Sequence, residues 1–414
     1  MRSRAILVLR LAVLLAGGAT GVNPVLAQGL LEVPEGYRSR LLFEFDPTVD
    51  FTLHLQALCY SPTGEPILYE HGELRVTRGD SEVVLARFEP PVFGSFCKVM
   101  PSGGAVIFGE NSTGDIFSVP LEGGGARKLG NLPFIFDLAF APEAAGPEVG
   151  GQAFVSALGP VGNSIYRFDA ASTPPIEPPD EVVTGIPDFS GPLTFDEEGN
   201  LYYVTASFES ESLVRFSPPL LARGLGPGAI EFAEGEVLLS ELDGAFNMEW
   251  LSGKLYLTDL GFGSGVGRLV VIDSRRNFLV STFASVPFDG LASVTSLAVH
   301  PGSEDFEPGA GEAGGKLLVH TSDFATLSHV VEVTPEFFFV RGEVNGDEPV
   351  DLSDAVHLLG YLFLGGAPPS SRAAADVNAD GRVDVTDPIY LLDFLFRGGP
   401  TVPAPFPERG PDLR

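Results

Sequence analysis

The chain has 414 residues, 44% of them hydrophobic and 10% aromatic, and this apolar content excludes a chain that is disordered throughout. Its 50 glycines and 35 prolines follow no three-residue period, so they indicate a fold rich in turns rather than a collagen. The formal net charge of −30 repels phosphate backbones and argues against nucleic-acid binding.

The N-terminus predicts an export signal. Arg2, Arg4 and Arg10 give a basic start, an apolar run surrounds the last of them, and a cleavage motif of small residues ends at Ala27. A retained anchor is the alternative, but the run is too short to cross a bilayer. We therefore expect residues 1–27 to be removed, and a mature protein without a membrane span that is secreted, periplasmic or held at the cell surface.

Residues 50–335 repeat one pattern six times: an apolar strand, a turn with Pro, Gly, Ser or Asp, a second strand, a polar loop and a third strand. The units are Leu55–Val76, Phe96–Val119, Phe136–Phe168, Gly191–Phe216, Asn247–Ile272 and Thr295–Val333. Their spacing of roughly 40–55 residues is in the range of propeller blades, and the strands are short and rich in β-branched and aromatic residues.

The repeats predict an all-β, six-bladed β-propeller over residues 28–335. The early strand Tyr37–Phe45 is left over, and it could join the last blade and close the ring. A long β-sandwich or a β-helix is the structural alternative. Cys59 and Cys97 could form a disulfide in an exported protein or stay as buried thiols, and the sequence leaves both open.

The fourth unit, FDEEGNLYYVT followed by SLVRF, resembles the blade signature of NHL-type and gluconolactonase-like (SMP-30-like) propellers. The resemblance implies a fold more than an activity, because this scaffold hosts lyases, lactonases and binding proteins. Gluconolactonase-like enzymes hold a divalent metal in the central channel with Glu, Asn and Asp. Here the corresponding candidates are Asp137, Asn247 and Glu249, and a water-lined channel is the alternative.

No catalytic constellation emerges from the propeller sequence, which lacks a G-x-S-x-G elbow and an H-E-x-x-H motif. We therefore favour a ligand- or protein-binding module. The alternative is a hydrolase acting on a carbohydrate or a lactone, as part of polysaccharide degradation.

After Pro335 the composition changes, and two segments repeat with an offset of 33 residues, Glu343–Gly366 and Asp376–Gly399. In the second copy, oxygen ligands alternate along a 12-residue loop with Gly381 at the sharp turn, as Ca²⁺ requires. The predicted ligands are Asp376, Asn378, Asp380, Asp384, Asp387 and the carbonyl of Arg382. A helix with one apolar face follows the loop, and a plain acidic turn is the alternative.

This loop–helix pair, with D-x-N-x-D-G-x-V-D-x-x-D in its second copy, resembles a type I dockerin, an EF-hand-like α-helical module. The resemblance implies calcium-dependent folding and attachment to a cohesin-like module of another protein. It also implies partner contacts at equivalent positions of the two helices. These are Ser353, Leu359, Thr386, Leu392 and Arg397.

The first copy departs from the pattern, since Glu343 replaces the Asp at position 1 and Glu348 replaces the turn glycine. We expect a weaker calcium site there, and a loop that works without metal is the alternative. Its remaining predicted ligands are Asn345, Asp347, Pro349 (through its carbonyl), Asp351 and Asp354. The dockerin is expected over residues 336–400, followed by a Pro-rich tail, 401–414, that either wraps the helices or hangs free.

Overall fold

The computed structural model describes most of the chain from residue 31 to residue 411. The described ranges are 31–45, 57–79, 81–158, 162–168, 180–207, 211–242, 244–260, 266–286, 293–301, 303, 306, 315–322, 328–336, 338–347 and 349–411. The expected export signal, its cleavage site at Ala27 and the turn residue Glu348 lie outside these ranges. The chain divides into two compact units, one of them mostly within residues 39–333 and the other mostly within 334–414. None of the described helices is long and apolar enough to cross a membrane.

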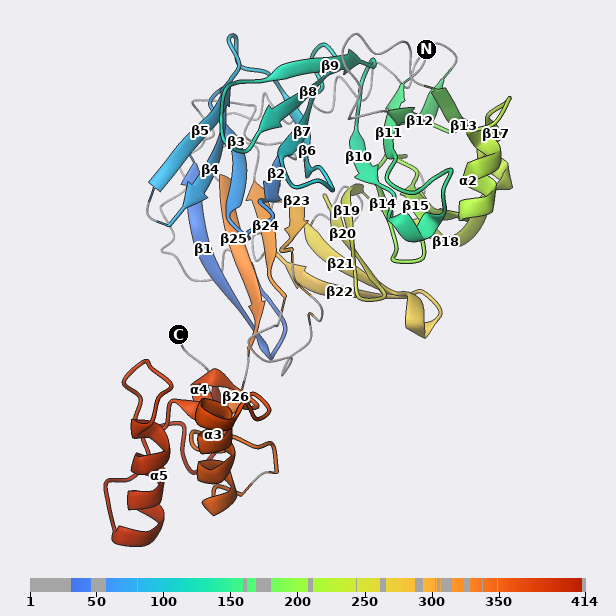
Figure 1. Ribbon diagram of the computed structural model, residues 1–414. Helices are drawn as coiled ribbons and strands as arrows, with labels where there is room; N and C mark the ends of the chain where they lie inside the picture. The colour runs from blue at the N-terminus through green and yellow to red at the C-terminus, as the bar shows by residue number, and fades with distance from the viewer. Residues whose placement is uncertain are drawn as a thin grey trace. The chain divides into compact units, whose positions relative to one another are not determined.

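The larger unit is a ring of six antiparallel sheets, which confirms the predicted six-bladed β-propeller (Figure 1). Blade 1 contains β2 (Leu58–Tyr60), β3 (Pro66–Glu70), β4 (Glu73–Arg78) and β5 (Ser81–Arg87). Blade 2 contains β6 (Gly94–Val99), β7 (Ala105–Glu110), β8 (Asp115–Pro120) and β9 (Arg127–Asn131). Blade 3 contains β10 (Asp137–Phe140), β11 (Ala153–Leu158), β12 (Asn163–Phe168) and β13 (Asp180–Ile186), with the short β17 (Ile230–Glu231) added in parallel.

Blade 4 contains β14 (Leu193–Phe195), β15 (Leu201–Val204), β16 (Glu211–Phe216) and β18 (Glu236–Leu242). Blade 5 contains β19 (Ala245–Leu251), β20 (Lys254–Asp259), β21 (Arg268–Asp273) and β22 (Leu279–Ser285). Blade 6 contains β23 (Ser293–Val299), β24 (Leu317–Ser322), β25 (Ser328–Pro335) and the N-terminal strand β1 (Tyr37–Phe45). As expected, β1 pairs with β25, so both ends of the propeller sequence share one sheet and close the ring.

The first strand of each blade lies at the centre of the ring. The strands β2, β6, β10, β14, β19 and β23 each contact the first strand of the blade before and the blade after. Blade 2 and blade 5 are therefore three steps apart in a ring of six, on opposite sides of the central channel. This placement decides which side chains can meet across the channel.

Apolar side chains fill the spaces between the blades. Phe108 of blade 2 is fully buried and contacts the rings of Tyr69 and Phe88 from blade 1, at centroid distances of 5.1 and 4.9 Å. Burying side chains of this size contributes about 1.5–3 kcal/mol each. Cys59 in β2 and Cys97 in β6 form a disulfide, which links the innermost strands of two neighbouring blades and resolves the alternative that the sequence left open.

A short helix, α2 (Pro218–Gly224), interrupts blade 4 between β16 and β18. Pro218 stands in the first turn, where its missing N–H costs nothing, and Leu221 is fully buried against the core of blades 3 and 4. The described residues also contain single-turn 3₁₀ helices: η3 (Phe232–Glu234) in the same connection, and η2 (Glu143–Ala145) and η4 (Ser274–Arg276) elsewhere.

The smaller unit contains α3 (Leu352–Leu364), α4 (Arg372–Ala375) and α5 (Thr386–Arg397), with a two-stranded sheet of β26 (Phe338–Phe339) and β27 (Gly410–Pro411). Both long helices end at a glycine in the left-handed conformation, Gly365 and Gly398. α3 and α5 pack against each other around a small apolar core. Its fully or nearly fully buried members are Val344, Ala355, Leu358, Ala375, Val377, Leu391 and Val402.

The Pro-rich tail packs on this unit. Val402 lies in the core, the Phe406 ring contacts the Phe394 ring edge-on at 5.3 Å, and the Tyr390 hydroxyl donates to the Thr401 carbonyl at 3.1 Å. Arg341 joins the two ends of the unit, since its guanidinium donates to the carbonyls of Ala404 and Ala373 at 3.0 and 3.1 Å. Of the two expectations for the tail, the structure shows wrapping for residues 401–411.

Candidate functional site

The second predicted calcium loop is held in a tight turn by its own acidic side chains. Asp376 Oδ1 and Oδ2 each accept a backbone N–H at 3.0 Å, from Asp380 and Gly381. Asp387, which closes the loop, accepts from the N–H of Asp384 at 2.8 Å and from that of Asn378 at 3.3 Å. Gly381, at the sharp turn, has a φ of +88°. Glycine adopts this conformation without a steric clash because it has no Cβ.

The first loop has a similar network, but the donors to its first position are shifted by one residue. Glu343 accepts from the N–H groups of Gly346 and Asp347 at 2.6 and 3.0 Å. Asp354 accepts from Asp351 and Val344 at 2.8 and 2.6 Å, and the bond from Asp351 is equivalent to the bond from Asp384 to Asp387 in the second loop. The first position also differs because Glu343 is half-buried where Asp376 is buried. In both loops, therefore, the first and last carboxylates accept backbone N–H groups of the loop.

The donor set of the second loop fits a hard divalent cation. Asp376 and Asp387 are almost completely buried. Burial raises the pKa of Asp387, and the neighbouring charge of Asp376 raises it further. Two buried carboxylates that repel each other at the start and end of a loop are stabilised by a cation between them. Within the described residues, however, no three His, Cys, Asp or Glu side chains are grouped so that they could hold a metal ion. The calcium assignment therefore depends on donor chemistry and spacing.

The predicted partner hydroxyls, Ser353 and Thr386, are exposed and belong to the loop networks. The amide Nδ2 of Asn378 donates to Thr386 Oγ1 at 3.1 Å, and Thr386 in turn donates to Asp384 at 2.6 Å. The side-chain and backbone hydrogen bonds that Thr386 donates to Asp384 lower the pKa of that carboxyl. Asn345 and Ser353 make the equivalent bond at 2.6 Å in the first loop. Each hydroxyl thus couples the shape of its loop to the first turn of the following helix.

The other predicted contact positions are less alike. Leu359 and Leu392 are half-buried, and Leu392 packs against the core of the unit. Arg397 is exposed at the end of α5 and lies 3.4 Å from Asp393 in an ion pair. An exposed pair of this kind contributes little to stability, so its charges are available to a partner.

Each of the two long helices exposes an apolar stripe that the sequence analysis identified only in part. The stripe on α3 contains Leu352, Val356 and Phe363. The equivalent positions 33 residues later are Val385, which directly precedes α5, and Ile389 and Phe396 within α5. All six are between 42% and 65% exposed. Residues i, i+4 and i+11 lie on one face of a helix. The offset of the repeat could have found them, because equivalent positions in the two copies are both apolar.

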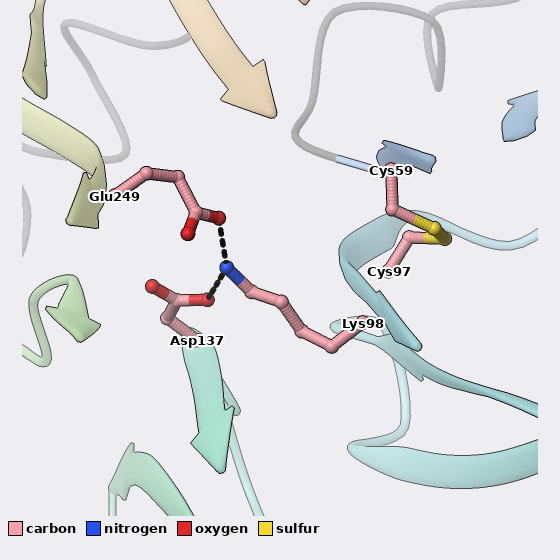
Figure 2. Close-up of a disulfide and its surroundings, with 5 residues drawn as sticks. All are labelled: Cys59, Cys97, Lys98, Asp137 and Glu249. Carbon is pink, nitrogen blue, oxygen red and sulfur yellow. Dashed lines mark hydrogen bonds and ion pairs between the residues drawn. A yellow bond between two sulfur atoms is a disulfide. The ribbon is translucent and has the colours of Figure 1, made fainter. Parts of the chain in front are cut away.

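A second polar cluster lies inside the propeller channel, and it also includes a residue that the sequence analysis did not single out. The ammonium of Lys98 in β6 forms an ion pair with Glu249 in β19 and lies 3.7 Å from Asp137 Oδ1 in β10 (Figure 2). Because β6 and β19 are on opposite sides of the ring, the Lys98–Glu249 pair crosses the channel. The Cys59–Cys97 disulfide adjoins this cluster on the side of β6.

The electrostatics of this cluster follow from burial and from the ratio of two acids to one base. The two carboxylates raise the pKa of Lys98 and so favour its protonated ammonium, although burial opposes this change. Burial raises the pKa of Asp137 to about 6; the Glu249 charge also raises it, and the Lys98 charge opposes the change. The cluster therefore carries one net negative charge above that pH.

The three channel candidates named from the sequence do not act as one ligand set. Asp137 and Glu249 meet at Lys98, whereas Asn247 Oδ1 accepts the backbone N–H of Leu297 at 3.1 Å. Asp137 Oδ2 makes the equivalent bond, 3.2 Å, with the N–H of Leu193. In both cases an inner-strand side chain fixes the inner strand of the next blade, so Asn247 has a structural partner.

The family model described as the dockerin type I domain matches residues 341–392, which include both loops, all of α3 and the first half of α5. No curated protein sequence matches the chain.

The chain is also similar to several solved structures over its propeller. The PQQ domain of a pyranose dehydrogenase from Coprinopsis cinerea is 12% identical, with a TM-score of 0.53, covering 73% of this chain and 97% of that one. A Trichoderma reesei protein of carbohydrate-active enzyme family AA12 is 11% identical, with a TM-score of 0.52, covering 76% of this chain and 100% of that one. A gluconolactonase from Xanthomonas campestris is 14% identical, with a TM-score of 0.45 and coverage of 67% and 85%.

At these identities the similarity to solved structures shows the fold alone. The C-terminal match, by contrast, coincides with the duplicated loops and helices described above. The chain is therefore a six-bladed β-propeller followed by a C-terminal helical region that matches the dockerin type I family model, and this region is called the dockerin below.

Proposed function

We propose that this chain is an exported calcium-binding protein whose dockerin, residues 336–400, attaches the propeller, residues 28–335, to a cohesin-type module. One observation carries the proposal: the dockerin exposes the same apolar stripe twice, on α3 and on α5. Exposed large apolar side chains that recur at equivalent positions are typical of an interaction surface rather than of a solvated helix.

Calcium would be held by the oxygen atoms of the loop positions predicted from the sequence. Asp376, Asp380 and Asp387 supply carboxylates in the second loop, and Asn378 supplies an amide oxygen. The ion would neutralise the two buried carboxylates and so fix the loop, and with it the first turn of α5. We propose the same role for the first loop, with weaker binding because its first position is a longer and less buried Glu343.

The partner would contact the apolar stripes together with the polar positions beside them. Ser353 and Thr386 lie at the helix starts, where the loop networks fix their hydroxyls. Leu359, Leu392 and Arg397 lie further along the helices. Because the stripe depends on the loop for its position, we expect binding to require calcium.

For the propeller we propose a ligand- or protein-binding role. The alternative, a carbohydrate- or lactone-directed hydrolase brought to its substrate by the dockerin, stays a prediction. The dockerin resemblance supports that alternative, since dockerins often accompany polysaccharide-degrading enzymes. Within the described part of the channel, Lys98 is paired with Asp137 and Glu249, and both carboxylates favour its protonated form.

The test is a pull-down in which the full-length mature chain is the bait. The candidate partners are type I cohesin modules and the proteins secreted by the host. The pull-down is run in Ca²⁺, then with a chelator, and then with an Asp376→Ala/Asp387→Ala bait. We expect a cohesin-bearing partner that is retained only in Ca²⁺ and only by the intact loop. Retention that is unaffected by the chelator, or no calcium-dependent partner at all, contradicts the proposal and leaves the dockerin a stabilising calcium module.

A further inference from the structure

The centre of the propeller channel is occupied by a positive charge that the chain itself supplies. The Lys98 side chain extends from β6 and places its ammonium between the carboxylates of Asp137 and Glu249 (Figure 2). These residues come from blades 2, 3 and 5, so three of the six blades meet at one ammonium. The side chains of Lys98 and Glu249 are only 16% and 21% exposed, and that of Asp137 is fully buried.

Two carboxylates directed at one point from different blades have the chemistry of a divalent-cation site. In this chain, the oxygens that would ligate such an ion are already engaged. Glu249 Oε1 and Asp137 Oδ1 face the Lys98 ammonium, and Asp137 Oδ2 accepts the Leu193 N–H. Asn247, the neutral oxygen donor nearest in sequence, is used by Leu297.

We propose that Lys98 is a built-in counter-cation that takes the place of a divalent metal ion in the channel. The ammonium neutralises the charge that would otherwise attract the metal, and it is covalently attached, so calcium does not displace it. The calcium bound by this protein therefore belongs to the dockerin loops, and the propeller channel stays closed to divalent ions. Removing the ammonium would open a cation site between Asp137 and Glu249.

A terbium ion, which binds oxygen ligands as calcium does, tests this because nearby tryptophan sensitises its emission. The chain has one Trp, and it directly follows Glu249 in β19. Emission excited through Trp250 is therefore most sensitive to an ion in the channel. The experiment uses the full-length chain, and the dockerin contribution is the same in every variant.

We expect Lys98→Ala to increase the tryptophan-sensitised emission severalfold and to bind one more terbium ion per chain than the wild type. Lys98→Ala/Glu249→Gln should return both quantities to the wild-type level. Lys128→Ala is the matched control: it removes the same charge from an ion pair in which the lysine is exposed and lies beside Asp115, and it should gain no ion.

Two outcomes would overturn the proposal. One is a Lys98→Ala protein that is folded, as shown by near-ultraviolet circular dichroism, and gains no ion. The other is a loss of one bound ion when Glu249→Gln is made in the wild type, since that would mean that the native channel already holds metal. This second comparison remains decisive even if Lys98→Ala does not fold. Both comparisons are independent of whether the dockerin finds a cohesin.

Discussion

Replacing Lys98 with Met should destabilise the propeller strongly, because it leaves Asp137 buried beside Glu249 without a counter-charge. At the observed 3.7 Å between Lys98 Nζ and Asp137 Oδ1, the attraction between unit charges is about 4 kcal/mol at an effective dielectric constant of about 20. Removing one partner of a buried pair typically costs about 3–5 kcal/mol. We expect a loss in this range at pH 8, since Met keeps most of the packing of the Lys stem.

The loss of stability in Lys98→Met should be smaller at low pH, and the direction of this pH dependence follows from the pKa of Asp137. Burial raises this pKa to about 6 in the folded protein, above the usual value of about 4 in an unfolded chain. The folded state therefore binds the proton more tightly, so Asp137 contributes stability below pH 4 that is lost as the pH rises through 6. Without Lys98 the pKa rises further. At pH 5 the variant's Asp137 is protonated, and we expect a loss of about 1–2 kcal/mol.

Urea unfolding followed by Trp250 fluorescence measures both values. The single Trp of the chain lies in β19, so the signal reports on the propeller alone. The measurement is made in excess Ca²⁺, so that the proposed calcium loops are saturated in every variant. Lys128→Met, which removes an exposed lysine from its ion pair with Asp115, is the control and should cost less than about 1 kcal/mol. A loss for Lys98→Met below 1 kcal/mol at pH 8, or an equal loss at pH 5, would refute the assigned electrostatics.

Three further predictions concern the disulfide and the dockerin. Cys59→Ala/Cys97→Ala opens a loop of 38 residues and should lower the free energy of unfolding by about 4 kcal/mol, measured in urea against the oxidised wild type without reductant; an equal stability of the two proteins would contradict it. Asp387→Ala should weaken calcium binding by calorimetry more than Asp354→Ala does, and a larger effect of Asp354→Ala would contradict the predicted order of the two sites. Phe396→Ser should weaken capture by the partner at least tenfold while leaving the calcium affinity unchanged, and an unchanged affinity for the partner would exclude the α5 stripe from the interface.

Local spacing in the sequence was sufficient to predict the parts of this protein that repeat. Propeller strands are short and are joined by short turns, so the pattern of one blade is complete within about 40–55 residues of the sequence. A calcium loop places its ligands within 12 residues, so the ligand set from Asp376 to Asp387 could be proposed from spacing alone, and it stays a prediction. The closing strand Tyr37–Phe45 was also identified, because it was an unused strand at the start of a six-unit repeat.

The tertiary structure decided which distant residues meet. Lys98 and Glu249 are 151 residues apart in the chain, and no local period connects them. They meet because blades 2 and 5 face each other across a closed ring, so a long cation and a long acid span the channel. For the same reason the sequence could not tell that Asn247 fixes the next blade, that Cys59 reaches Cys97, or that the tail covers α5 at Phe394. Each of these depends on how separate elements pack, which is a long-range property that residue types and spacing along the chain do not encode on their own.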